Sequence, residues 1–115
     1  MLQKYNYKEV LEEDIGYYLT KNNIVLTRDN YDGVYDDMFV ADCITGKGIG
    51  SYTFSSELAK QNVFDNLALC KDACEEFSIS SSEFGDKIYN EEFNQLDVII
   101  RCYLLGVILP NFITD

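Results

Sequence analysis

The sequence contains no histidine, no tryptophan and a single proline, Pro110. Histidine is the commonest general base in enzymes, so its absence excludes Ser–His and Cys–His nucleophiles. The N-terminal segment has no basic stretch followed by an apolar one, and the longest apolar run, "VIIRCYLLGVIL", is interrupted by Arg101. That run is shorter than the ~20 residues of a membrane-spanning helix. We therefore expect a cytoplasmic protein without a membrane anchor, a cofactor or enzymatic activity.

Basic residues are also scarce. The chain has nine Lys and Arg against 20 Asp and Glu, which gives a formal net charge of −11. Binding free nucleic acid normally requires cations that displace the phosphate counterions, so direct binding of nucleic acid is not expected. A strongly acidic surface instead attracts basic proteins.

The four cysteines lack the spacing of a zinc site. No Cys-x-x-Cys pair is present, and there is no histidine to complete a tetrahedral set. Three of the four lie in apolar stretches, where a cysteine behaves as a small hydrophobic residue. We expect free thiols that contribute to the core, and no metal; the four are Cys43, Cys70, Cys74 and Cys102.

The segment "TGKGIGSYTF", residues 45–54, has three glycines at alternate positions. A dinucleotide fingerprint needs a third glycine three residues after Gly48, where Ser51 stands, and a Walker loop needs Ser or Thr after its lysine, whereas Gly48 follows Lys47. We interpret Gly46, Gly48 and Gly50 as a turn that lets two strands reverse. A role of this loop in placing Tyr52 on a partner surface stays open.

The length of 115 residues and the 47% content of hydrophobic residues predict one domain over 1–115. Apolar periodicity predicts helices over 7–22, from Ser55 or Ser56 to Phe77, from Ser82 to Asn90 and over 93–109, where Pro110 ends the last. Short strands are expected in "NIVLT", "MFVADCIT" and "SYTF", and a turn at Asp32-Gly33. The predicted fold is α+β, a short β-hairpin or small antiparallel sheet packed with three to four helices. The last helix is then either the central core helix or a subunit contact, and Asp97 and Arg101 can pair along it.

The acidic residues are clustered in two segments. Five lie between Asp29 and Asp42 without a Lys or Arg, and eight lie between Asp72 and Asp97 with only Lys87 among them. Carboxylates three or four residues apart on a helix stand about 5–6 Å apart at Cβ, comparable to successive phosphates of a nucleic-acid strand. An ordinary solvated surface is the alternative interpretation. The predicted partner-binding residues are Asp32, Asp36, Asp37, Asp72, Glu75 and Glu76.

The segment "DDMFVADCITGKGIGSYTFSSELAKQNVFDNLALCKDACEEF", followed by "DVIIRCYLLGVIL", resembles small acidic proteins of phages and mobile elements of low-GC Gram-positive bacteria. The motifs that carry the resemblance are "TGxGxGSYTF", the helix containing Asn66-Leu67 and Glu75-Glu76-Phe77, and "RCYLLG" at 101–106. They cover about residues 36–109. The resemblance implies an inhibitor of host defence, such as an anti-CRISPR protein. Its acidic residues would occupy the positively charged channel of an RNA-guided nuclease or the arginines that read its target-adjacent motif.

Three alternatives remain open at this point. One is a non-enzymatic phage accessory module that binds a host protein through an apolar surface, as a homodimer packed on the last helix. The second is an anti-restriction protein, and the third is a small nucleotide-binding enzyme that uses the glycine loop.

Overall fold

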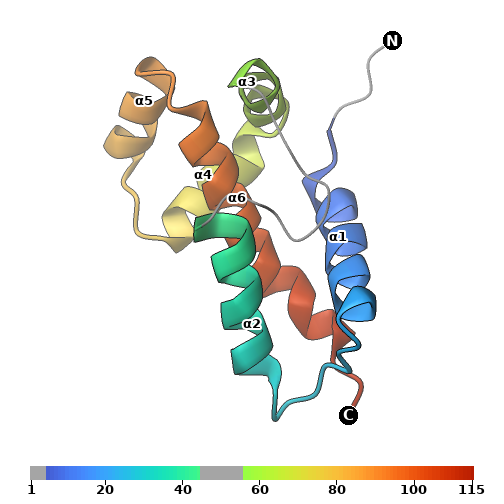
Figure 1. The fold of residues 1–115 in the computed structure, drawn as a ribbon. Coiled ribbons are helices and arrows are strands. Elements are labelled where there is room, and N and C mark those ends of the chain that lie inside the picture. Colours follow the sequence, from blue (N-terminus) through green and yellow to red (C-terminus); the bar gives the residue numbers. More distant parts are fainter. Residues whose placement is uncertain (1–4, 45–55) are drawn as a thin grey trace.

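The computed structural model describes residues 5–44 and 56–115 (Figure 1). All regular elements of these two segments are helical. In chain order they are α1 (Tyr7–Lys21), α2 (Tyr31–Phe39), the π-helical turn η1 (Val40–Ile44), α3 (Ser56–Asp65), α4 (Leu67–Glu76), α5 (Ser81–Tyr89), α6 (Phe93–Ile108) and the 3₁₀ turn η2 (Leu109–Phe112).

The prediction of an α+β fold is therefore wrong. Residues 38–44 of the segment "MFVADCIT", which was expected as a strand, form the end of α2 and the turn η1. Asp32-Gly33, expected as a turn, lies inside α2. The physical reason is the spacing of Val34 and Met38, which are four residues apart and both buried, so that a helix places them together against the core. The segment "NIVLT" is a loop between α1 and α2. The expected strand "SYTF" and the glycine loop lie outside the described residues.

The periodic helices were predicted with small errors at their ends. The helix expected over 7–22 is α1, and the helix that Pro110 was expected to end is α6, followed by η2. The single helix expected up to Phe77 is two helices, because the backbone departs from helical geometry at Asn66 (φ −132°, ψ 39°). The Asn66 side chain donates from Nδ2 to the carbonyl oxygens of Tyr5 (3.0 Å) and Asn62 (2.9 Å), which fixes this break against the N-terminal segment.

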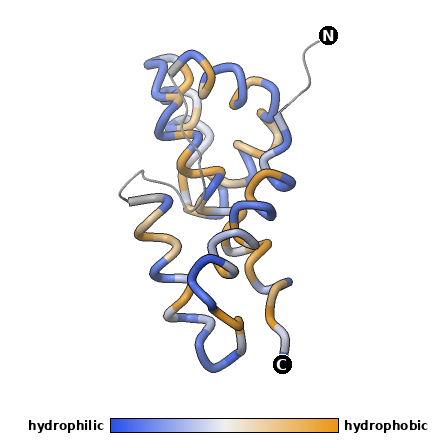
Figure 2. The backbone as a smooth tube through the Cα atoms, turned by 45° about the vertical axis from the view of Figure 1, so that its right-hand side comes forward, coloured by the Kyte–Doolittle hydropathy of each residue, from blue (hydrophilic) through white to orange (hydrophobic). Residues whose placement is uncertain are grey.

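Helix α6 is the centre of the fold. Helices α1, α2, α3, α4 and α5 all pack on it, and α1 lies along it in Figure 1. Apolar side chains project from α6 toward different neighbours, which explains why its sequence is apolar nearly all round. Figure 2 shows hydrophobic and hydrophilic positions alternating along the surrounding helices, as expected for elements with one buried face. Of the two interpretations of this helix, the central core helix is correct.

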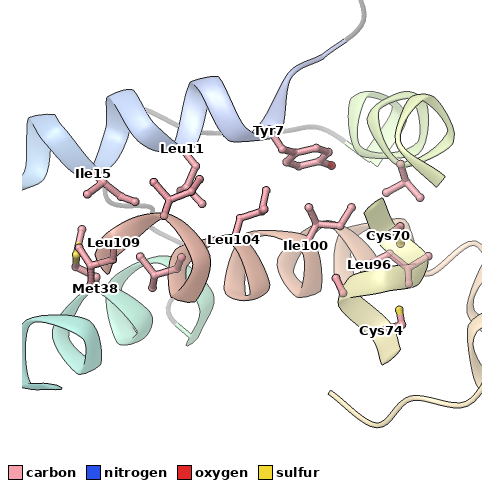
Figure 3. Close-up of a cluster of buried hydrophobic side chains, with 14 of the residues drawn as sticks. Tyr7, Leu11, Ile15, Met38, Cys70, Cys74, Leu96, Ile100, Leu104 and Leu109 are labelled. Carbon is pink, nitrogen blue, oxygen red and sulfur yellow. The ribbon is translucent and has the colours of Figure 1, made fainter. Parts of the chain in front are cut away.

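The core consists of side chains spaced three or four residues apart on facing helices. In Figure 3, Tyr7, Leu11 and Ile15 of α1 point toward the side of α6 that carries Ile100 and Leu104. At one end of α6, Leu96 lies beside the α4 cysteines, and at the other end Leu109 lies beside Met38. Leu96, Ile100, Leu104 and Leu109 are completely buried.

The segment Phe93–Phe112 is long and apolar enough to cross a membrane, judged by length and composition alone. More than half of its most apolar stretch is buried inside the protein. Its packing against the surrounding helices accounts for the apolar composition, because a core helix has the same sequence character as a membrane span.

The cysteines differ from one another. Cys70 and Cys74 are free and buried under α4, where burial raises the pKa of the Cys70 thiol to about 12. Such thiols are inert at neutral pH and serve as core residues, as predicted. Cys102 is disulfide-bonded, so the prediction of four free thiols is wrong for this residue.

A buried ion pair joins η1 to the middle of α6. The Arg101 guanidinium donates from Nε to Asp42 Oδ2 (2.9 Å) and from Nη2 to Asp42 Oδ1 (2.7 Å), and both side chains are almost completely buried. Arg101 Nη2 also lies 3.7 Å from Asp14 Oδ2 of α1, within ion-pair range but too far for a hydrogen bond. Arg101 therefore connects α1, η1 and α6.

A buried hydrogen bond joins α1 to α6 near the start of each helix. The Tyr7 hydroxyl donates to Asp97 Oδ1 at 2.6 Å, a short bond typical of an ionised acceptor. Burial and the nearby Asp97 carboxylate raise the pKa of Tyr7 above its ordinary value, so that the hydroxyl keeps its proton. Asp97 and Arg101 thus bind residues of other elements rather than serving only as a pair along their own helix.

We expect substitution of Arg101 by Ala to destabilise the protein strongly. The substitution leaves Asp42 buried without its two charged hydrogen bonds, and breaking a buried pair in this way costs about 3–5 kcal/mol. Urea unfolding of Arg101→Ala measures the loss, and Arg28→Ala, at an exposed arginine, is the matched control. A decrease in the free energy of unfolding below about 1 kcal/mol would contradict the buried ion pair between Arg101 and Asp42.

We expect Leu104→Ala to lower the free energy of unfolding by about 2–5 kcal/mol, because it opens a cavity at a completely buried position of the central helix. Val107→Ala, at a residue of the same helix that is 48% exposed, should cost much less. Thermal unfolding followed by circular dichroism compares the two. Equal losses would show that this side of α6 does not face the core.

Candidate partner-binding surface

The first predicted acidic group lies on α2. An Asn–Thr pair fixes the start of this helix: Asn30 Oδ1 accepts from the Thr27 backbone N–H (2.7 Å), and the Asn30 backbone N–H donates to Thr27 Oγ1 (3.3 Å). Burial of Val34 and Met38, together with the partly buried Tyr31, Tyr35 and Phe39, orients the helix so that its opposite face points to solvent. The side chains of the predicted residues Asp32, Asp36 and Asp37 are all exposed.

The second predicted group lies on α4. Cys70, Ala73 and Cys74 are buried, Leu69 is partly buried against the core, and the remaining positions of the helix are exposed. The predicted residues Asp72, Glu75 and Glu76 are exposed, at spacings of three and four residues. Carboxylates at this spacing lie on one side of a helix about 5–6 Å apart at Cβ.

The structure brings the two groups onto one scaffold but not into one continuous helix face. Helices α2 and α4 both pack on α6 and make no substantial contact with each other in the part of the chain that is described. We call the exposed carboxylates of α2 and α4 the acidic surface; its members are Asp32, Asp36, Asp37, Asp72, Glu75 and Glu76. None of the six takes part in an ion pair between described residues.

Two members of the acidic surface occupy an unfavourable position in their helix. Glu75 and Glu76 are the last two residues of α4, and no basic residue lies in the last turn. A helix C-terminus carries partial negative charge, so carboxylates there are destabilising by roughly the few tenths of a kcal/mol that cations would contribute. Helix stability therefore does not explain these residues.

Two other acidic residues of the clusters are not at the surface. Asp42 and Asp97 are 5% and 4% exposed and accept hydrogen bonds from Arg101 and Tyr7. Counting charges along the sequence could not separate them from the exposed residues. The available signal was their position within apolar runs, "FVADCI" and "QLDVII", because a charge in such a run is usually buried with a partner.

Asp14 belongs to the buried polar region rather than to the acidic surface. Burial raises the pKa of its carboxyl above the ordinary value, although the nearby Arg101 partly opposes this effect. Its Oδ2 atom is buried without a hydrogen bond. Burial likewise raises the pKa of Tyr5 to about 12.

The described residues contain no group of three or more potential metal ligands. A hollow of about 460 Å³ lies between the start of α1 and α4 and is lined by residues that include Lys8, Asn66 and Asp72. Lys8 and Asp72 bring opposite charges to its wall, so it does not favour a polyphosphate. The structure assigns no catalytic residue here.

No protein-family model matches the chain, and neither does any curated protein or solved structure. The resemblance to small acidic phage proteins therefore stays a prediction. Within the described residues, the geometry defines an acidic, all-helical protein in which the six carboxylates of the acidic surface form no ion pair.

We expect Asp14→Asn to raise stability at neutral pH. Because burial raises the pKa of Asp14, the folded state holds this proton at pH values where the unfolded chain has lost it. Stability should therefore decline as pH rises from the ordinary pKa of the carboxyl to its raised value, and the amide should remove that decline. Urea unfolding across this range tests the sign, with Glu12→Gln, at an exposed residue of the same helix, as the control. A loss of stability at neutral pH would show that attraction to Arg101 outweighs burial.

Proposed function

We propose that this protein is an anti-defence inhibitor, in the first place an anti-CRISPR protein. It binds a nucleic-acid-guided nuclease in the bacterial cytoplasm and covers the basic surface that holds nucleic acid. The acidic surface would occupy that place as a mimic of phosphates. This function needs no cofactor, catalytic residue or direct contact with nucleic acid.

The observation that carries the proposal is the exposure of all six acidic-surface carboxylates without an ion pair among the described residues. Carboxylates that are already neutralised by neighbouring cations attract a basic partner weakly. The buried Arg101 forms its ion pairs with Asp42 and Asp14, so it does not neutralise the carboxylates of the acidic surface. Because none of them forms an ion pair among the described residues, the carboxylates of the acidic surface can attract an external basic channel.

The rigid scaffold supports the same proposal. Both acidic helices are anchored by completely buried residues, Met38 in α2 and Cys70 in α4. Anchored helices hold their carboxylates at fixed positions, so less conformational entropy is lost on binding than with a flexible acidic tail. Electrostatic complementarity then accelerates association at low salt.

We expect the fourfold reversal Asp36→Lys, Asp37→Lys, Asp72→Lys and Glu76→Lys to abolish inhibition of the target nuclease. The matched control reverses four exposed acids of other helices, Glu9, Glu12, Glu13 and Glu57, and so has the same net charge. The measurement is cleavage of target DNA by a panel of CRISPR nucleases at low and moderate salt, together with the nuclease affinity of each variant. Circular dichroism checks that both variants keep their helices.

The two variants separate mimicry from a general effect of charge. Mimicry requires that inhibition by the native protein weaken with salt and that only the reversal on α2 and α4 remove it. Full inhibition by that variant would overturn the acidic surface as the binding site. Equal loss in both variants would show that net charge, rather than these positions, is responsible.

A further inference from the structure

Three aromatic side chains lie along one side of α2. Tyr31, Tyr35 and Phe39 recur every four residues, which makes them neighbours on the helix surface. The ring centroids of Tyr31 and Tyr35 are 6.2 Å apart, and those of Tyr35 and Phe39 are 6.1 Å apart, with the rings inclined by only 25° and 23°. All three side chains are partly buried against the core. We call these three rings the aromatic ladder.

Helix α6 leaves part of the aromatic ladder uncovered. The exposed Gly106 of α6 faces the middle ring, because a Cβ atom at this position would lie 3.9 Å from Tyr35 Cε2. Glycine has no side chain, so α6 places nothing over this part of the ring. The ladder thus lies at the border between the core and the solvent.

Two carboxylates accompany the ladder on its solvent side. Asp32 precedes Tyr35 by three residues, and Asp36 precedes Phe39 by three residues. Side chains at this spacing are neighbours about 5–6 Å apart at Cβ. Both carboxylates are exposed, and neither forms an ion pair between described residues. Helix α2 therefore presents the same pair of a carboxylate and an aromatic ring twice, about one turn apart.

The third carboxylate of α2 lies on another side of the helix. Burial raises the pKa of Tyr18 in α1, and the nearby Asp37 carboxylate adds to this increase, so Asp37 faces α1. Asp37 is also two residues away from both Tyr35 and Phe39, a spacing at which helical side chains do not meet. It has the same charge as Asp36 without a place beside the ladder.

No cation of the described chain is shown to occupy this side of α2. The helix itself contains no Lys or Arg. The cation–π contacts between described residues join Lys21 to Tyr17 and Lys60 to Phe93, away from the ladder. Arg28, the nearest cation before the helix, is exposed and forms no ion pair in the described part of the chain.

We propose that the aromatic ladder and its two carboxylates, Asp32 and Asp36, bind arginine side chains of the partner protein. A guanidinium group is planar and weakly hydrated, so it can lie against an aromatic ring while it donates two hydrogen bonds to a carboxylate. A lysine ammonium can pair with the carboxylate but has no planar surface for the ring. Each carboxylate–ring pair therefore accepts one guanidinium in preference to an ammonium group.

This inference rests on the proposed function in one respect, namely that the partner is basic. It adds that the two helices of the acidic surface have different roles. Helix α4 contains no aromatic residue, so its carboxylates attract cations by charge alone. Helix α2 distinguishes arginine from lysine and thereby contributes to the choice of partner.

The test uses a flexible peptide of alternating arginine and serine as the probe. Two control peptides have lysine, or the uncharged citrulline, in place of arginine. Isothermal calorimetry at low salt measures affinity, and NMR of ¹⁵N-labelled protein locates binding. We expect the arginine peptide to bind about fivefold more tightly than the lysine peptide, which corresponds to one exposed cation–π contact. The citrulline peptide should not bind, and the shifts specific to arginine should lie on α2.

Substitution of the middle ring separates recognition of arginine from general attraction of charge. Tyr35→Leu keeps an apolar side chain but removes the ring, so the preference for arginine over lysine should fall. Tyr35→Phe keeps the ring and should retain the preference. Tyr17→Leu, at a tyrosine of α1 that is 56% exposed, is the matched control and should behave as the native protein does.

Substitution of a carboxylate repeats the test without disturbing the core. Asp36→Asn should weaken binding of the arginine peptide several-fold, because Asp36 is exposed beside the ladder. Asp37→Asn changes the net charge equally at a position that faces α1, and it should weaken binding much less. Circular dichroism checks that all variants keep their helices.

Three results would overturn the inference: equal affinity of the native protein for the arginine and lysine peptides, shifts confined to α4, or equal losses in Asp36→Asn and Asp37→Asn. The peptide assay and the nuclease assay can fail separately. A preference for arginine without inhibition of any nuclease would contradict the proposed function alone. Inhibition of a nuclease without a preference for arginine would contradict this inference alone.

Discussion

The two hydrogen bonds between Arg101 and Asp42 fix the arrangement on which the rest of the described fold depends. Arg101 lies in the middle of the central helix, and Asp42 lies in the turn that follows α2, so the pair sets how α2 sits on α6. A guanidinium and a carboxylate match in two parallel bonds only in a narrow range of orientations. Apolar contacts such as the one between Met38 and Leu109 tolerate small displacements of one helix relative to another, whereas the geometry of this ion pair does not. The position of the acidic residues of α2 follows from it.

The buried and the exposed carboxylates of this protein differ in whether they have partners within the chain. Inside, carboxylates are matched to specific donors, Asp42 to Arg101 and Asp97 to Tyr7, because an unpaired buried charge is costly. Outside, the carboxylates of the acidic surface form no ion pair among the described residues, at a cost that is small because water solvates them. The formal charge of −11 is thus concentrated on the surface. A basic partner would meet these surface carboxylates, because the buried Asp42 and Asp97 already accept hydrogen bonds from Arg101 and Tyr7.

Elements with sustained helical periodicity could be predicted from the sequence, and elements defined by distant partners could not. In α1 and α6 the apolar residues recur over four turns, and the structure has both helices near their predicted ends. The segment "MFVADCIT" is rich in β-branched and aromatic residues, which favours a strand locally. Its helical form depends on burial of Met38 and on the bond from Arg101, 59 positions away from Asp42. The exposure of the six predicted carboxylates was correct, while the burial of Asp42 and Asp97 required knowledge of partners that no local pattern contains.

The place of α6 in the chain has a consequence for how the protein acquires its structure during synthesis. Helices α1 to α5 leave the ribosome before the helix on which they all pack. The hydrogen bond of Tyr7 cannot form until Asp97, 90 positions later, has been synthesised. The hydrogen bonds of Asp42 likewise require Arg101. Contacts of such long sequence separation slow folding, because the loop entropy is lost before the contacts form. Until α6 emerges, the apolar faces of the earlier helices stay exposed, and the high negative charge of the nascent chain then opposes its aggregation.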